Sequence, residues 1–179
     1  KGKEAASSHT GSMTSDYTII KSAMDKLGVI LVDSIEKFFN AIMLFSWIDE
    51  HPVGRRAKIL TNAGGPGILT TDMLSKTQAQ VTSLTEVSQS QLKSLLPSAA
   101  SISNPIDLLG DAGSERYKEA LEIVAADDET DIIIAVLTPQ YVTEIYETAR
   151  VLIKAVEDYP KPIVPIFIGD FDVYKGLSL

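Results

Sequence analysis

Residues 58–67 read KILTNAGGPG, a short segment with the apolar pair Ile59 and Leu60 followed by AGGPG, which holds three glycines and a proline. We expect a strand at 58–62. The segment 63–67 is typical of a tight turn into a helix, which we expect from about Pro66 to Lys76. Pro66 would take the first helical position, where its missing N–H has no helical partner to lose. A strand that passes through a glycine turn into a helix is the basic unit of an α/β fold.

The same alternation continues downstream of this unit. The segment 132–137 (IIIAVL) is apolar on both alternating faces, as a parallel strand covered by helices on both sides must be. We expect further strands at 81–84 and 163–168, and a helix at 87–96 closed by Pro97. Two more helices are expected to be capped by Ser114 and Thr143, with buried faces made of Tyr117, Ala120, Leu121 and Val124, and of Ile145, Ala149, Leu152, Ile153 and Val156. The sequence therefore predicts a doubly wound α/β protein with a mostly parallel sheet.

The chain before this alternation is organised differently. Residues 1–12 are small and polar and are expected to form a loop. Apolar residues at helical spacing predict a helix from Met13 that stops at Gly28. A short strand at 29–32 and a helix capped by Ser34 should follow. The apolar positions of the two helices are Tyr17, Ile20, Met24 and Leu27, and Ile35, Phe38, Ile42 and Phe45. The segment 49–58 (DEHPVGRRAK) breaks the pattern and is the best candidate for a domain boundary.

Composition excludes several classes of function. The 179 residues carry 16 basic and 24 acidic side chains, a net charge of −8, which argues against nucleic acid and anionic membranes as partners. The chain has no cysteine and only two histidines, so we expect no disulfide framework, no thiolate site and no all-histidine metal centre. No apolar run is long enough to span a membrane and no secretory signal is apparent. We expect a cytoplasmic protein, processed or cut from something longer because it opens on Lys1.

Ligands of doubly wound sheets bind where the strands end, which selects the segments 62–67, 103–112, 138–140 and 169–170. In the first of these, Gly64, Gly65 and Gly67 leave the backbone bare at the start of a helix. Free N–H groups and the positive end of the helix dipole would favour an anion such as phosphate. The alternative is an ordinary strand-to-helix turn, which also needs glycine. The spacing matches neither the dinucleotide fingerprint nor the P-loop.

His9 lies among small residues in the segment AASSHTG at 5–11. Neutral imidazole is a good nucleophile toward phosphorus near pH 7, and small neighbours would let such a loop enter narrow sites. The alternative is a solvated loop histidine, which is how we interpret His51. Asn104 and Asp107, beside Pro105, have the residue types of a turn that bonds its own backbone, and the alternative is a contact to substrate.

Three motifs occur in order along the chain: SHTG at 8–11, TNAGGPG at 61–67, and NPID at 104–107 followed by GDA at 110–112. Together they resemble the nucleoside-diphosphate-forming (NDP-forming) acyl-CoA synthetases, also called ADP-forming acetate–CoA ligases, which are related to succinyl-CoA synthetase. The resemblance covers nearly the whole chain. It implies that His9 is the phosphorylated catalytic residue and that Gly64, Gly65 and Gly67 bind phosphate. Asn104 and Asp107 are assigned to substrate binding, and no metal ligand is assigned.

The resemblance also implies a domain plan. Residues 1–50 would be the C-terminal part of a phosphohistidine (succinyl-CoA ligase-like) domain, 51–57 a linker, and 58–179 a flavodoxin-like ligase domain cut short at its C-terminus. The family's CoA-binding domain and ATP-grasp domain have no counterpart in the chain. We therefore expect an inactive fragment without cofactors, whose partners are those domains or a subunit carrying them. The longer protein would use CoA, ATP or ADP, phosphate and Mg²⁺.

The family reaction converts acyl-CoA, phosphate and a nucleoside diphosphate into free acid, CoA and a nucleoside triphosphate, through a phosphohistidine. A first alternative is the synthetase-like region of a protein lysine acetyltransferase, and the presence of His9 favours a working synthetase over it. A second alternative is a flavin or receiver module. A receiver needs an acidic cluster after its first strand, where this chain has Asn62 and glycines.

Overall fold

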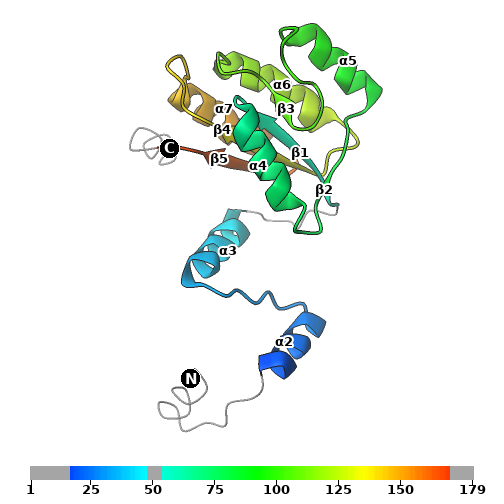
Figure 1. Cartoon of the computed structure of the whole chain (residues 1–179), viewed down its shortest axis with the longest axis vertical. Coiled ribbons are helices and arrows are strands. Elements are labelled where there is room, and N and C mark those ends of the chain that lie inside the picture. The colour runs from blue at the N-terminus through cyan, green and yellow to red at the C-terminus, as the bar shows by residue number, and fades with distance from the viewer. Residues whose placement is uncertain (1–16, 48–53, 170–179) are drawn as a thin grey trace. The chain divides into compact units, whose positions relative to one another are not determined.

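The computed structural model describes residues 17–47 and 54–169 (Figure 1). The chain divides into two compact units, Lys1–Asp49 and Glu50–Leu179.

The first unit contains two helices, α2 (Tyr17–Lys26) and α3 (Ile35–Trp47). Gly28 follows α2 with φ of +70°, the left-handed conformation that favours glycine after a helix. The backbone N–H of Lys37 donates to Oγ of Ser34 over 3.1 Å, which confirms Ser34 as the cap of α3. The predicted helix start at Met13 lies outside the described residues.

The prediction of a strand at 29–32 is wrong. This segment joins α2 to α3 without forming a strand or a helix. A strand exists only when a neighbouring strand accepts and donates its backbone hydrogen bonds, and the described part of this unit offers no such neighbour.

Over its described residues, 54–169, the second unit is a sheet of five strands with four helices. The strands are β1 (Arg56–Thr61), β2 (Gln80–Val81), β3 (Ile106–Asp107), β4 (Ile132–Leu137) and β5 (Ile163–Phe167). The helices are α4 (Gly64–Leu74), α5 (Glu86–Leu95), α6 (Ser114–Ala126) and α7 (Ile145–Asp158). The strand expected at 81–84 is thus shorter and begins one residue earlier.

All of the strand pairs are parallel, and the sheet order is β2-β1-β4-β5. Strand β1 is central: β2 pairs with its first residues, and β3 pairs with its last two, Leu60 and Thr61. On its other side β1 pairs with β4 over five residues. The predicted doubly wound, mostly parallel α/β architecture is therefore confirmed.

The two faces of the sheet bury different clusters. Alternate residues of the central strands, such as Leu60 and Ala135, pack with α5, α6 and α7 in the main core, and their neighbours Ile59 and Ile134 pack with Leu74 of α4. Figure 1 shows the same division, with α4 crossing one side of the strands. The predicted inward face of α6 is fully buried. Alternation of apolar residues thus supplies both cores of one sheet.

Three helix details differ from the predictions. Helix α4 begins at Gly64, so Pro66 is its third residue and not its first; proline is tolerated there because the whole first turn has N–H groups without helical partners. Residues Gly113 and Glu144, and not Ser114 and Thr143, precede the first residues of α6 and α7. Two residues predicted to face inward on α7, Ile153 and Val156, are 43% and 50% exposed. Thr148 and Ala155 are buried on that helix instead.

Candidate functional site

The turn between β1 and α4 presents free backbone donors at the carboxyl edge of the sheet. Oγ1 of Thr61 accepts the N–H of Ala63 over 3.1 Å, and Gly67 N–H donates to the Ala63 carbonyl. The N–H groups of Gly64 and Gly65 have no acceptor among the described residues. Two adjacent donors without a partner in the described part of the chain therefore lie at the positive end of an eleven-residue helix. This is the geometry that favours an anion.

The three glycines of the turn have three different surroundings. A Cβ on Gly65 would have nothing within 4 Å, so the space beside its Cα is open. A Cβ on Gly67 would lie 3.0 Å from Cγ2 of Thr61 and 3.2 Å from Cβ of Pro105, so this glycine is needed for packing. A Cβ on Gly64 would lie 3.3 Å from Oδ2 of Asp107. Gly64 and Gly65 thus suit ligand binding, and Gly67 has a structural role of its own.

Asp107 points one carboxylate oxygen toward the start of α4. Its Oδ1 accepts the N–H of Leu109 over 2.9 Å, which fixes the orientation of the group. Its Oδ2 lies beside Gly64 and has no hydrogen-bond donor within residues 17–47 and 54–169. Leu109 holds a φ of +71°, unusual for a branched side chain. Arg116 stabilises this loop by donating through Nη1 to the carbonyl of Leu108 over 2.8 Å.

The side chain of Asn104 is hydrogen-bonded to backbone groups of β1 and of the residue that follows β2. Its Oδ1 accepts the N–H of Ile59 over 2.9 Å, and its Nδ2 donates to the carbonyls of Ala57 and Thr82. A cis peptide bond joins it to Pro105. The hydrogen-bond partners lie 22 to 47 positions away along the chain, so Asn104 joins distant segments and does not close a turn on its own neighbouring backbone. Its assignment to substrate binding stays a prediction.

Asn62 joins the ends of the two central strands. Its Nδ2 donates to the carbonyl of Thr138 over 2.7 Å, and its Oδ1 accepts the N–H of Thr138 over 2.8 Å. This side chain is 1% exposed. Sequence analysis missed the role of Asn62, although an asparagine placed directly after a buried strand is a recognisable signal for such a bridge.

Glu144 is a second residue that sequence analysis missed. Its Oε2 accepts both the N–H and the Oγ–H of Ser114, over 2.9 and 2.8 Å, and so caps α6 from a distant loop. The hydrogen bond from the backbone N–H of Ser114, and to a lesser extent the one from its hydroxyl, lowers the pKa of Glu144 below its usual range. The amino end of α6 thus already carries its anion, unlike that of α4.

The two histidines, His9 and His51, lie outside the described residues. The catalytic role of His9 therefore stays a prediction. Within the described ranges, no group of three or more histidine and acidic side chains is arranged to hold a metal ion. No helix in those same ranges is long and apolar enough to cross a membrane.

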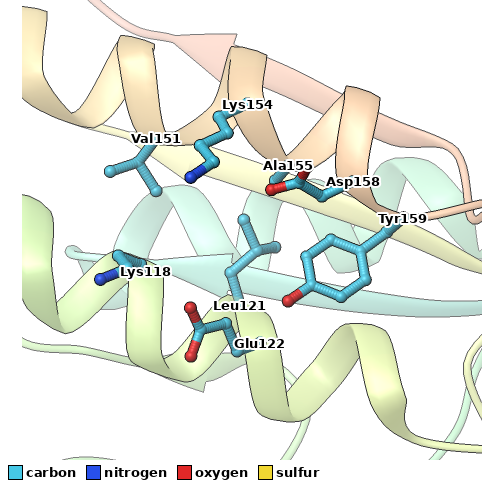
Figure 2. A pocket seen from close by; sticks show the side chains of 8 residues that line it. All are labelled: Lys118, Leu121, Glu122, Val151, Lys154, Ala155, Asp158 and Tyr159. Carbon is cyan, nitrogen blue, oxygen red and sulfur yellow. The ribbon is translucent and has the colours of Figure 1, made fainter.

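A groove of about 80 Å³ lies between α6 and α7. Figure 2 shows Lys118 and Glu122 of α6 opposite Lys154 and Asp158 of α7, with Leu121 between them. The groove lies along the middle and C-terminal parts of both helices, away from their N-terminal ends near the strand termini. Small size and mixed charge make it a poorer candidate site than the start of α4.

Comparisons with known proteins agree with the sequence motifs. A family model for the succinyl-CoA ligase-like flavodoxin domain matches residues 1–45. Acetate–CoA ligase [ADP-forming] II subunit alpha of Pyrococcus furiosus is 32% identical over 99% of the chain, which spans 39% of that relative. Acetate–CoA ligase [ADP-forming] I of Archaeoglobus fulgidus is 36% identical over 77% of the chain and 20% of its own length.

A solved structure gives the same result. It is that of a dinucleotide forming acetyl-coenzyme A synthetase 1 from Ca. Korarchaeum cryptofilum, in complex with phosphate and ADP. It is 28% identical and covers 99% of this chain with a TM-score of 0.90. The chain corresponds to 38% of that protein. The resemblance drawn from the three motifs is therefore confirmed. The chain spans about two fifths of the length of the Pyrococcus furiosus subunit and of the Ca. Korarchaeum cryptofilum protein.

Proposed function

We propose that this chain is part of an NDP-forming acyl-CoA synthetase, the family that its sequence and structure resemble over almost its whole length. The observation that carries the proposal is the pair of free N–H groups at Gly64 and Gly65, found in the motif on which the resemblance rests. The reaction interconverts acyl-CoA, phosphate and a nucleoside diphosphate with free acid, CoA and a nucleoside triphosphate.

The chemistry proceeds in three transfers. Phosphate displaces CoA from the acyl group and forms an acyl phosphate. A lone pair of the His9 imidazole then attacks phosphorus, so that an N–P bond forms while the P–O bond to the acyl group breaks and the free acid leaves. An oxygen of the nucleoside diphosphate attacks the same phosphorus last and releases the imidazole. Such transfers depend on stabilising a highly charged group in position more than on proton chemistry.

In this scheme α4 binds the phosphoryl group. The N–H groups of Gly64 and Gly65 would donate to phosphoryl oxygens, and the open space at Gly65 would admit them. The proposal for Gly67 is indirect: its lack of a side chain lets α4 pack against Thr61 and Pro105, and so places the two donors.

The Asp107 carboxylate refines the kind of ligand that this helix would accept. Its negative charge opposes a free phosphate beside Gly64. A phosphoryl group attached to an imidazole brings a ring N–H or a positive charge with it, and this would offset the repulsion. The Asp107 carboxylate would therefore contact the phosphorylated imidazole. Asn104 would support the same loop through its three backbone hydrogen bonds.

The domain plan is part of the proposal. Residues 1–50 would form the C-terminal part of a phosphohistidine domain, and 58–179 would form the flavodoxin-like ligase domain. Residues 51–57 would be the linker between the two. A CoA-binding domain and an ATP-grasp domain, in the same protein or in a subunit, would supply CoA and nucleotide binding. Mg²⁺ would be bound with the nucleotide, because the described residues offer no acidic cluster for it.

The proposal is tested by labelling His9 in the protein that carries this chain together with those domains. Incubation with γ-labelled nucleoside triphosphate should give a phosphoprotein that is stable to base and labile to acid, as phosphohistidine is. His9→Ala should abolish labelling and turnover, while the matched variant His51→Ala should keep both. Labelling and turnover of His9→Ala at the parent rate would refute the assignment.

A further inference from the structure

The segment 138–140, one of the strand ends where ligands are expected to bind, takes no part in the scheme proposed for α4. It follows β4 at the carboxyl edge of the sheet, as the turn into α4 follows the neighbouring strand β1. Asn62 bonds both backbone groups of Thr138 and so ties this segment to the start of that turn. Two loops from distant parts of the sequence therefore begin side by side at this edge.

Gln140 extends its side chain over the loop that follows β3. A Cβ on Gly110 would lie 3.7 Å from Cγ of Gln140, 3.8 Å from its Cδ and 3.9 Å from the backbone oxygen of Asn62. The side chain of Gln140 and the carbonyl of Asn62 thus surround the same point. Gly110 leaves that point unfilled, and it lies three residues after Asp107 in the same loop.

The amide group of Gln140 has no hydrogen-bond partner in the described part of the chain, whereas its backbone is fixed. The backbone N–H of Gln140 donates to Oγ1 of Thr143 over 2.7 Å, and the carbonyl of Gln140 accepts the N–H of Thr143 over 3.1 Å. Gln89 differs, because its side-chain amide donates to the carbonyl of Leu84 over 2.7 Å. Gln140 thus presents two unpaired N–H donors from a closed turn at the carboxyl edge.

We propose that Gln140 donates a hydrogen bond through Nε2 to the phosphoryl group that α4 binds. This deepens the proposed function and rests on its anion site at Gly64 and Gly65. A phosphoryl group attached to imidazole presents three terminal oxygens, and the two backbone N–H groups can each serve one of them. The third oxygen needs a donor from another segment, and Gln140 supplies one from the loop that Asn62 ties to the turn.

A neutral donor suits this position because Asp107 lies beside Gly64. A lysine or arginine side chain in the same loop would attract the Asp107 carboxylate and reduce the effect of its charge. An amide donates hydrogen bonds and leaves that charge in place. In this arrangement Asp107 disfavours free phosphate relative to a phosphorylated imidazole, and Gln140 adds hydrogen bonding to the phosphoryl oxygens.

The experiment titrates the full chain with inorganic phosphate at constant ionic strength and follows the amide resonances by ¹H–¹⁵N NMR. We expect the side-chain amide resonance of Gln140 and the backbone resonances of Gly64 and Gly65 to shift with one dissociation constant. Shifts at the two glycines without a shift at Gln140 would overturn this inference and leave the proposed phosphate site intact. No shift at the two glycines would overturn the phosphate site, and the inference with it.

Variants of Gln140 separate its amide from its packing against Gly110. Gln140→Leu keeps an apolar contact with Gly110 but has no amide, and it should raise the dissociation constant for phosphate about tenfold. Gln140→Glu should raise it further, because a negative charge then faces the anion. Gln91→Leu and Gln91→Glu make the same changes at an exposed position of α5 and should bind phosphate as the parent does.

Melting temperatures of the same variants complete the test. Gln140 is exposed, so Gln140→Leu should melt within about 1 °C of the parent. Parent-like phosphate affinity in Gln140→Leu would reduce the role of Gln140 to packing and overturn the proposal. None of these outcomes depends on phosphorylation of His9, so the proposed reaction is tested separately.

Discussion

The side chain of Asn62 forms both hydrogen bonds that the backbone of Thr138 offers, one to its carbonyl over 2.7 Å and one from its N–H over 2.8 Å. The two residues are 76 positions apart and lie directly after the paired strands β1 and β4. This bridge fixes the strand ends from which the turn into α4 departs. It therefore holds the candidate phosphate-binding N–H groups in place without touching them.

Asn62→Ala should destabilise the second unit. The substitution leaves the N–H and carbonyl of Thr138 without their partner, and each unpaired group lowers the free energy of unfolding by about 1–3 kcal/mol. Urea denaturation followed by circular dichroism would measure the change. Asn40→Ala, at an exposed position of α3, should shift the free energy of unfolding by no more than about 0.5 kcal/mol. Equal effects of the two variants would contradict the structural role of Asn62.

Gly67→Ala should also lower stability. The new Cβ would lie 3.0 Å from Thr61 and 3.2 Å from Pro105, and overpacking of this kind typically lowers the free energy of unfolding by about 1–3 kcal/mol. Gly65→Ala is the matched control, since its Cβ would meet open space. It should leave thermal stability unchanged or raise it slightly, because alanine favours a helix. The reverse order of melting temperatures would show that the two glycines have been assigned the wrong roles.

Gly65→Val should separate ligand binding from folding. Its β-branched side chain would fill the open space beside Gly65 and crowd the approach of a ligand to the N–H groups of Gly64 and Gly65. Losing one donor of this kind typically lowers a rate by about two to three orders of magnitude. Phosphoenzyme formation, measured with labelled nucleoside triphosphate in the complete protein, should fall accordingly while the melting temperature stays near the parent value. Ile68→Val, a change at an exposed position on the same helix, should label normally.

Asp107→Asn should increase the affinity of the chain for inorganic phosphate. The substitution removes a negative charge beside Gly64, and a charge at this range changes binding by roughly fivefold or more. Phosphorus NMR titration at constant ionic strength would measure the dissociation constant. Asp128→Asn makes the same change in net charge at an exposed position and should leave phosphate affinity near the parent value. Unchanged affinity in Asp107→Asn would separate this carboxylate from the anion site.

Asp131→Asn should destabilise the protein in a pH-dependent manner. The Arg56 side chain donates to Asp131 from Nη2 over 2.7 Å and from Nε over 3.0 Å, and with the Arg56 backbone N–H these bonds hold the pKa of Asp131 well below its usual range. A carboxylate whose pKa is lowered in the folded state stabilises the protein at pH values above its pKa in the unfolded state, which is about 3.9. This stabilisation is lost as the pH falls from that value toward the pKa in the folded state.

The urea midpoint of Asp131→Asn should therefore lie below that of the parent by the same amount at pH 7 and pH 5. The difference should shrink below about pH 4, where Asp131 begins to take up a proton in the unfolded state of the parent while it stays ionised in the folded state. For Asp128→Asn we expect no such trend. A parent–variant difference that is constant from pH 7 to pH 2 would rule out this linkage.

Several features of the fold could be predicted because a few adjacent residues determine them. The run 132–137 is apolar at every position, and it forms a strand paired on both sides at the predicted bounds. The spacing of Tyr117, Ala120, Leu121 and Val124 places all four on one buried helix face. Ser34 caps α3 and Gly28 follows α2 in a left-handed conformation, as expected. Periodicity and local hydrogen bonding operate within one or two turns of chain, so the sequence alone determined them.

Other features depended on contacts between distant segments. The sequence suggested Ser114 as a cap, but a carboxylate brought in by Glu144, 30 residues away, satisfies the start of α6. The sequence does not distinguish Gly65 from Gly67, and only the packing of Thr61 and Pro105 beside Gly67 does so. The apolar segment 29–32 has strand composition, yet a strand needs a neighbour to complete its hydrogen bonds. The sequence determined which residues favour burial or a turn, and only the tertiary structure decided which partners they have, because those partners come from segments far apart in the chain.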